Sequence, residues 1–254
     1  MKKLLFFLLF APFILFGQNG LEYYEEYMPV SACDSIIHYK FYSASYCSEY
    51  KLSEWTIYHH SPDRWENIEE FPRRNNWRMD LEKRGINQKY FTGTRRDRGH
   101  SVPVRNMNFD EQAMRECFYT TNLVPMTRKL NRGIWRRLEN WLSGKERQWA
   151  KNFEGITIIS GWTGILGHMT EAKIPIPEYY YKIIVDIKAN RALAFLIPQY
   201  PEEDDYGEVF DYIISFEELE SKTGIDFFYK LNDDLEREIE GLVSGDINTL
   251  KKNQ

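Results

Sequence analysis

The chain has 254 residues, of which 43% are hydrophobic and 28% are charged. This composition excludes a largely disordered chain, and the length allows one large hydrophobic core or two small ones. The formal net charge of −5, taken alone, argues against a nucleic-acid partner.

The N-terminus has the pattern of a secretory signal peptide. Lys2 and Lys3 precede an uncharged run of 13 residues that ends at Phe16 and is followed by Gly17. We predict a signal peptide over residues 1–17 and a secreted or periplasmic protein without stable membrane association after cleavage. A membrane anchor is the alternative, but a spanning helix needs roughly 20 apolar residues.

Three cysteines, Cys33, Cys47 and Cys117, follow the predicted signal peptide. An oxidising compartment permits one disulfide among them and leaves one thiol. We favour a Cys33–Cys47 pair, because these residues could face each other across a local turn. Three reduced, buried cysteines are the alternative, and the spacing fits no metal-binding motif.

The next part of the chain alternates strand-forming segments with polar connections. β-Branched and aromatic residues predict strands in residues 36–50 and 55–59, because such side chains suit a pleated sheet. Residues 61–87 are polar and predict a long surface connection. Residues 110–116 predict a short helix that begins with acidic residues.

Residues 130–149 contain the clearest helical pattern of the chain. Trp135, Leu138 and Leu142 recur at the spacing of one helix face. Gly144 is a candidate interruption of this helix.

The second half of the chain predicts a hairpin, a further strand and a further helix. Two apolar runs, residues 180–187 and 192–197, flank a turn-like segment, and residues 156–160 form a short β-branched run. Residues 216–223 predict a helix that ends at Gly224.

We predict a single α+β domain over residues 18–242, with a central antiparallel sheet flanked by helices, and a polar tail over residues 243–254. Charge is unevenly spread along this domain. Residues 73–147 contain 18 Lys and Arg against 8 Asp and Glu, whereas residues 154–240 contain 7 against 19. An acidic protein with a focused positive face is one interpretation, and two ordinary solvated surfaces are the other.

Residues 95–100 read RRDRGH and combine groups that suit phosphate chemistry. The imidazole of His100 can accept a proton near neutral pH, and an arginine can pair with a phosphate through two hydrogen bonds. Gly99 would allow the backbone to approach a ligand closely. A histidine in a charged surface loop is the commoner alternative for such a segment.

Residues 122–139 read NLVPMTRKLNRGIWRRLE and suggest a metal site at a helix start. The side-chain oxygen of Asn131 could bind a hard cation. Glu139 lies about 12 Å further along an ideal helix axis and could reach the same ion through water. A helix cap and an exposed ion pair are the structural alternatives for these two residues.

Together the two motifs resemble those of the DNA/RNA non-specific endonucleases, the ββα-metal nucleases. The DRGH segment is followed by N-x-x-P, by L-N-x-G-x-W and by L-E, in the order that the family has them. Similarity extends over roughly residues 36–231 and includes further matching blocks at residues 114–122, 159–161, 174–182 and 217–228.

The resemblance implies roles for individual residues. His100 matches the general base, and Asn131 matches the one side chain that binds the metal directly. Glu139 matches the acidic residue that holds the metal's water shell. Asn122 matches a polar position beside the histidine that orients it, and Arg98 would face phosphate. The implied metal is Mg²⁺, with Mn²⁺ as the alternative.

The family also places an arginine upstream against the phosphate, and we favour Arg74 over Arg73 for this role. One departure is Met126, where the family usually has glutamine after the proline, and methionine cannot make the same hydrogen bonds. The implied activity is hydrolysis of DNA and RNA through contacts to the phosphate backbone. A catalytically weakened nucleic-acid-binding protein and an exported effector toxin are the alternatives.

Overall fold

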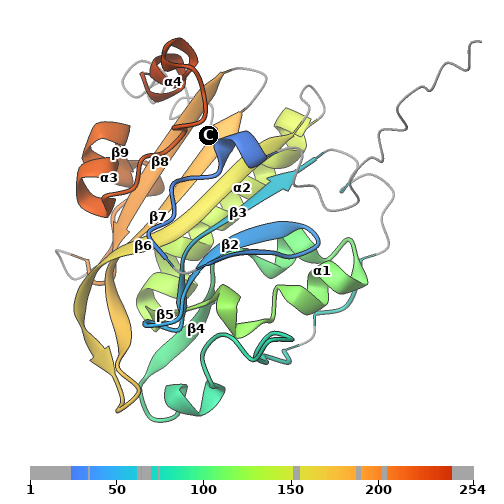
Figure 1. Ribbon diagram of the computed structural model, residues 1–254, viewed down its shortest axis with the longest axis vertical. Coiled ribbons are helices and arrows are strands. Elements are labelled where there is room, and N and C mark those ends of the chain that lie inside the picture. The colour runs from blue at the N-terminus through green and yellow to red at the C-terminus, as the bar shows by residue number, and fades with distance from the viewer. Residues whose placement is uncertain are drawn as a thin grey trace, which may run out of the picture.

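The computed structural model describes most of the chain between Tyr24 and Gly241, and Figure 1 traces it from the N-terminus in blue to the C-terminus in red. The predicted signal peptide and the predicted polar tail lie outside the described residues. The described ranges are 24–33, 35–61, 64, 70–73, 75–150, 155–186, 190–201 and 205–241, without the side chains of 143–150 and 191.

A seven-stranded sheet forms the centre of the molecule, with strand order β1-β2-β3-β6-β7-β8-β9. Each neighbouring pair is antiparallel, as predicted. The strands are β1 (Ser35–His38), β2 (Tyr42–Cys47), β3 (Leu52–His60), β6 (Ile156–Met169), β7 (Ile174–Asp186), β8 (Arg191–Pro198) and β9 (Ile213–Ile214).

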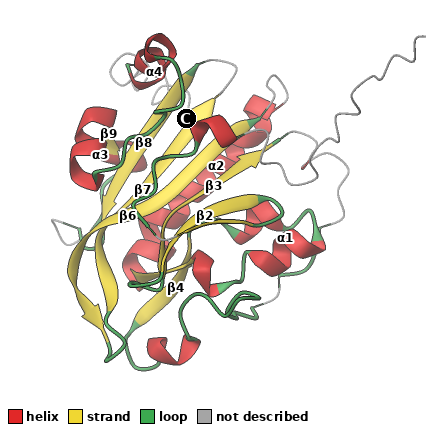
Figure 2. Ribbon diagram, viewed as in Figure 1, coloured by secondary structure: helices red, strands yellow, loops and turns green. Residues whose placement is uncertain are grey.

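A separate two-stranded ribbon pairs β4 (Arg96–His100) with β5 (Leu123–Thr127). A kinked turn, Leu130–Ile134, follows β5 and leads into α2 (Trp135–Ala150). These elements form the ββα arrangement that the resemblance implies. The other α-helices, labelled in Figure 2, are α1 (Glu111–Glu116), α3 (Phe216–Thr223) and α4 (Asp233–Glu240).

The sheet separates two hydrophobic cores. Successive side chains of a strand point to opposite faces. On β7, Tyr180 and Ile184 therefore join the core that contains the side chains of α2, while Tyr181 and Ile183 join the core that contains those of α3 and α4. We call these sides the α2 face and the α3–α4 face. The β4–β5 ribbon and α1 pack on the α2 face.

Most predicted elements are present, and their bounds differ where local geometry decides them. Residues 36–50 contain two strands rather than one, because the chain turns between them with a bond from Tyr39 N to Tyr42 O of 2.8 Å. Gly144 does not interrupt α2. The break lies at Gly133 instead, where φ is −102° and ψ is −109°. Helix α4 was not predicted.

Helix ends follow the expected capping chemistry. Asp110 precedes α1 and accepts hydrogen bonds from Gln112 N at 2.8 Å and Ala113 N at 2.9 Å. Gly224 ends α3 with a left-handed φ of 69°, as predicted. Among the described helices, none is long and apolar enough to cross a membrane.

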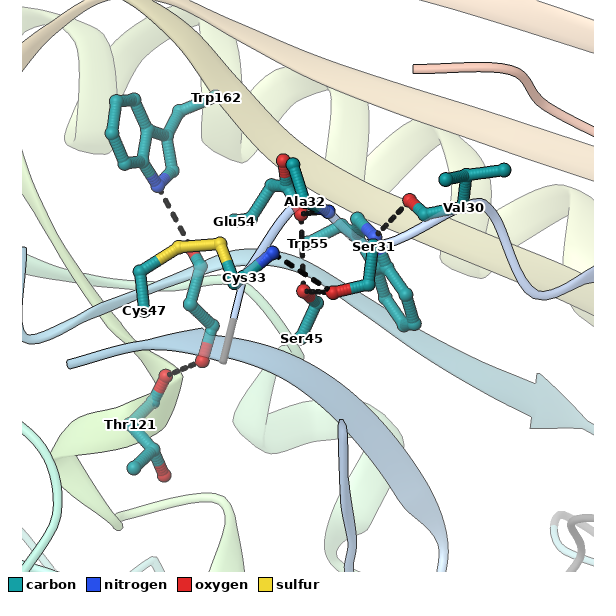
Figure 3. The surroundings of a disulfide bond; sticks show 11 residues. Val30, Ser31, Ala32, Cys33, Ser45, Cys47, Glu54, Trp55, Thr121 and Trp162 are labelled. Atoms are coloured by element: carbon teal, nitrogen blue, oxygen red, sulfur yellow. Dashed lines mark hydrogen bonds between the residues drawn. A yellow bond between two sulfur atoms is a disulfide. The ribbon is translucent and has the colours of Figure 1, made fainter. Parts of the chain in front are cut away.

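Cys33 and Cys47 form a disulfide with a Cα–Cα distance of 4.8 Å, which confirms the favoured pairing (Figure 3). The bond fastens the segment before β1 to the end of β2. Beside it, Trp55 Nε1 on β3 donates to Val30 O at 3.1 Å. Cys117 is a buried free thiol, and burial raises its pKa to about 12.

Candidate active site

A cleft of about 270 Å³ opens on the α2 face. His100 reaches it from the end of β4, Asn131 from the turn before α2, and Glu139 from α2 itself. The fold thus brings three predicted residues from separate segments to one cavity. The full lining is Arg73, Arg98, His100, Pro103, Val104, Arg105, Asn106, Asn131, Arg132, Arg136, Glu139 and Asn140.

The imidazole of His100 is held between two aromatic rings. Its centroid lies 4.3 Å from that of Trp77, and 5.1 Å from that of Phe118, which meets it edge-on. Within the described chain its Nε2 atom is buried and has no hydrogen-bond partner. Burial, together with the charge of Arg73, lowers the pKa of His100 to about 3. The histidine is therefore neutral at physiological pH and able to accept a proton.

Gly99 serves packing rather than ligand approach, which corrects our interpretation of the motif. A Cβ at this position would lie 2.5 Å from Met126 Sδ. Met126 is fully buried in the core under the ribbon. The departure from glutamine at Met126 therefore changes a core side chain and not a side chain of the cleft.

Asp97 fixes the orientation of the predicted metal ligand. Asn131 Nδ2 donates to Asp97 Oδ2 at 3.1 Å, and Arg132 donates to the same carboxylate at 2.6 and 2.8 Å. Although burial acts to raise it, these hydrogen bonds hold the pKa of Asp97 below its ordinary value. Because the amide nitrogen of Asn131 is engaged, its oxygen is the atom left to bind a cation.

Glu139 is half-buried in the cleft and feels the charge of a buried lysine, Lys182. Burial raises the pKa of Glu139 to about 7, against the opposing charge of Lys182. Lys182, on β7, is fully buried; its Nζ donates to Ser160 Oγ at 2.7 Å and lies 4.7 Å from the centroid of the Trp135 ring. The break at Gly133 separates Asn131 from the regular part of α2. An ideal helix therefore does not describe the distance between Asn131 and Glu139.

The arginines of the motif region reach the cleft by different routes. Arg73 lines it and donates from Nε to Asn75 Oδ1 at 3.0 Å, whereas the favoured Arg74 lies outside the described residues. Arg98 is exposed in the cleft and donates to Gln88 Oε1 at 2.8 Å. Gln88 also bonds the carbonyl of Trp77. Arg98 is thereby linked through Gln88 to the backbone of Trp77, the residue whose ring lies against His100.

Asn122 acts on the backbone that follows His100. Its side chain is fully buried, donates to Val102 O and Cys117 O at 3.0 and 2.8 Å, and accepts from Val102 N at 2.8 Å. Its own carbonyl accepts from Ser101 N at 3.0 Å. These bonds engage the acceptor and both donor positions of the amide, so Asn122 fixes the backbone of the loop after β4.

Motif analysis did not single out several polar residues of the cleft. Arg105 projects from the 3-10 helix Val104–Met107, and Arg136 projects from α2. Both are exposed, and neither forms an ion pair with a described residue. The only sequence signal for them was the excess of basic residues over residues 73–147. Asn106, a buried member of the lining, lies 3.2 Å from His60 Nδ1.

The donor set suits a hydrated, hard divalent cation. The described residues contain no group of three or more His, Cys, Asp and Glu side chains that could hold a metal. The amide oxygen of Asn131 and the carboxylate of Glu139 are the oxygen donors that magnesium prefers, and magnesium keeps several waters. A water occupies about 30 Å³ of liquid, so a cleft of about 270 Å³ has room for a hydrated ion beside a phosphate.

Comparison with known proteins identifies the class of this fold and site. The chain resembles the crystal structure of the EndoG/EndoGI complex with a TM-score of 0.69 and 18% identity, over 83% of this chain and 91% of that one. The family model of the DNA/RNA non-specific endonucleases matches residues 19–234. The chain therefore belongs to this family and is a nuclease, a metal-dependent hydrolase that acts on nucleic acid.

The relatives that the chain matches in sequence are also nucleases. A nuclease of Nostoc sp. is 27% identical over 217 residues, which are 80% of this chain and 76% of that protein. The mitochondrial nuclease EXOG of Xenopus laevis is 28% identical over 170 residues, and that of Homo sapiens is 26% identical over 161. The matches to these two cover 58% and 56% of this chain and only 46% and 42% of their own length.

Proposed function

We propose that this nuclease is an exported enzyme that uses magnesium to hydrolyse phosphodiester bonds of both DNA and RNA with little regard for sequence. The observation that carries the proposal is the convergence of His100, Asn131 and Glu139 on one cleft rimmed by arginines. Family membership supports the reaction class. The metal, the residue roles and the site of action are the proposed parts.

His100 is the proposed general base. It removes a proton from the water that attacks phosphorus, while the bond from phosphorus to the leaving oxygen breaks and that oxygen gains a proton from water. Burial disfavours the imidazolium, but the negative charge of the phosphate favours it during this step. The rings of Trp77 and Phe118 on either side hold the imidazole in place while the proton moves.

Asn131 and Glu139 are the residues that would hold magnesium, the first directly and the second through water. When bound, the ion would supply positive charge to the phosphate oxygens and a coordinated water of lowered pKa. Manganese, which prefers the same oxygen donors, is the alternative metal.

The arginines provide affinity without base recognition. Arg73, Arg98, Arg105 and Arg136 line the cleft, and their guanidinium groups suit phosphate oxygens. Contacts to phosphate position a nucleic acid but carry no sequence information. Low sequence preference follows from a cleft of this composition.

Export is supported by two features. Residues 1–17 have the composition of a signal peptide, and the Cys33–Cys47 disulfide is of the kind that persists in oxidising compartments. The mature chain should begin near Gln18. Mass spectrometry of protein recovered from outside the cytoplasm would contradict this proposal if Met1 were still present.

The central experiment is digestion of supercoiled plasmid and of single-stranded RNA by the purified mature protein. Both should be cut with magnesium, spared with excess chelator and cut again when magnesium is restored, while His100→Ala should be inactive in each case. Cleavage that persists in excess chelator would contradict the metal proposal. Cleavage of only one of the two polymers would contradict the proposed substrate range.

A further inference from the structure

Tyr200 is an aromatic residue at the surface, two residues after the end of β8. Its side chain is 53% exposed. Arg96 Nη2 donates to the Tyr200 hydroxyl at 2.7 Å, and the Arg96 guanidinium lies 5.6 Å from the ring centroid. The ring is therefore held at the surface by a hydrogen bond and a cation–π contact.

The segment that carries Tyr200 is fastened to the ribbon of the active site. Gln199 Oε1 accepts from Thr127 N at 2.9 Å, and Gln199 O accepts from Thr127 Oγ1 at 3.2 Å. Thr127 ends β5 and is paired with Arg96 on β4. Both Tyr200 and its arginine are thus fixed relative to the strand that ends at His100.

Arg96 extends the row of β4 side chains that reaches the cleft. Arg96, Arg98 and His100 occupy alternate positions of the strand, and the last two line the cleft. At about 3.3 Å per residue, Arg96 lies ~13 Å along the strand from His100. This separation corresponds to roughly four stacked nucleotides at about 3.4 Å each, so one strand can reach both places.

The charges around Tyr200 suit a base better than a phosphate. On the side of the ring towards His100, Arg98 is an exposed cation that lines the cleft. Asp205 follows Tyr200 in the chain and pairs with Lys129 at 3.5 Å. Acidic groups repel a phosphate, whereas the uncharged face of a nucleobase can stack on the exposed ring.

We propose that Tyr200, held by Arg96, is a stacking site for an unpaired nucleobase of the strand whose phosphate occupies the cleft. This inference rests on the proposed function of that cleft. Stacking tolerates every base, because each has an aromatic face. The bases of a duplex have both faces covered by their neighbours. The site therefore favours single-stranded DNA and RNA over duplex DNA.

Cleavage mapping on a single-stranded oligonucleotide with one abasic position tests the proposal. With the wild type, one phosphate at a fixed number of nucleotides from the abasic position should be cut ~5- to 100-fold more slowly than in the intact strand, because stacking on one base is lost. Tyr200→Ala should cut both strands with the same pattern. Tyr200→Phe should retain the slow position, and Tyr200→Leu, which is apolar but not aromatic, should lose it.

Tyr229 provides a matched control. It is 44% exposed and lies under a basic side chain, with Lys230 Nζ 5.9 Å from its ring centroid. It follows Phe228, which belongs to the core of the α3–α4 face, on the far side of the sheet from the cleft. Tyr229→Ala should leave the wild-type pattern unchanged.

The outcomes separate this inference from the proposed function. Normal magnesium-dependent cleavage with no slow position in the wild type overturns the stacking site and leaves the nuclease proposal intact. A slow position that persists in Tyr200→Ala also overturns it. Absence of any cleavage by the wild type contradicts both proposals. A slow position that disappears in Tyr200→Ala and remains in Tyr229→Ala supports the site.

Discussion

The two faces of the central sheet carry glutamates with the same raised pKa in opposite surroundings. Glu139, on the α2 face, and Glu240, on the α3–α4 face, both have a pKa raised to about 7, mainly by burial. The charges of Lys182 and Arg73 oppose the shift at Glu139. The charges of Glu220, Glu236 and Asp226 add to it at Glu240. One carboxyl lies among cations at a cleft, and the other lies among carboxylates.

This difference explains how an acidic protein can act on nucleic acid. Strands β6 to β9 and helices α3 and α4 come from the acidic part of the sequence, while the ribbon and α2 come from the basic part. The sheet places the basic part on one side, where its arginines surround the cleft. Net charge therefore says little about such a partner when the fold segregates the charges.

The largest expected effect on the α2 face comes from His100. His100→Ala, and His100→Gln as a variant that fills more of the space between Trp77 and Phe118, should lower turnover by ~10²–10⁴-fold. Magnesium binding should survive in both, because His100 is not a proposed ligand. Single-turnover rates and calorimetric titration of magnesium measure the two properties. A folded His100→Gln protein that no longer binds the ion would show that His100 is a ligand and not the base.

Asn131→Ala should have the next largest effect on activity. Loss of partners around a metal ligand costs about 10–100-fold, so loss of the direct ligand should exceed about 100-fold in magnesium affinity or activity. Stability should fall by only about 1 kcal/mol, since one hydrogen bond is lost and Asp97 keeps its bonds to Arg132. Asn140→Ala, on the exposed rim of the cleft, is the control. Unchanged magnesium affinity in Asn131→Ala would place the metal elsewhere.

Removal of Arg105 and Arg136 should weaken the binding of nucleic acid and reduce the dependence of that binding on salt. The double variant Arg105→Ala/Arg136→Ala should lower the slope of log affinity against log salt by about 2, because each guanidinium that neutralises a phosphate contributes about 1. Lys222→Ala/Arg237→Ala removes two charges from the α3–α4 face and should leave the slope unchanged. Equal slopes in the two double variants would show that the cleft does not carry the electrostatic contact.

The dependence of rate on pH should lack a step from His100 at the ordinary pKa of histidine. Burial lowers the pKa of His100 from 6.5 to about 3. The neutral base is therefore present above that pH and is lost only as the pH falls through it. We expect no inflection near 6.5 in kcat/KM of Glu139→Gln at saturating magnesium, because this variant lacks the carboxyl of Glu139, whose own pKa of about 7 falls in the same range. An inflection there in both the wild type and Glu139→Gln would assign an ordinary pKa to His100.

The smallest expected effect is a change in Tm, and it comes from Glu240 on the α3–α4 face. The folded pKa of Glu240 is raised to about 7 from 4.5, so the folded state binds the proton more tightly than the unfolded state. Its contribution to stability is thus fully present below pH 4.5 and is lost as the pH rises through 7. Glu240→Gln should raise Tm at pH 8 by no more than ~2 °C, because solvent screens these charges, and should not raise it at pH 4. A larger gain at pH 4 would contradict this account.

Local sequence chemistry was sufficient to predict much of the fold. The hairpin of β7 and β8, helix α1 with its acidic start and the end of α3 at Gly224 follow from patterns within a few residues. The order of motifs was sufficient to identify the family, because motif order does not depend on geometry. The Cys33–Cys47 pairing could be favoured from sequence because the two cysteines lie on either side of a local turn.

The interactions between residues of different segments were determined by the tertiary structure. The aromatic rings around His100 and the buried charge of Lys182 that acts on Glu139 come from segments far apart in the chain, and the position of the break at Gly133 was seen only in the structure. The roles of Gly99 and Met126 also changed once their contact was known. A motif specifies which chemical groups are available. Burial and the charges of neighbouring elements set their pKa values and orientations, and only the folded chain brings those neighbours together.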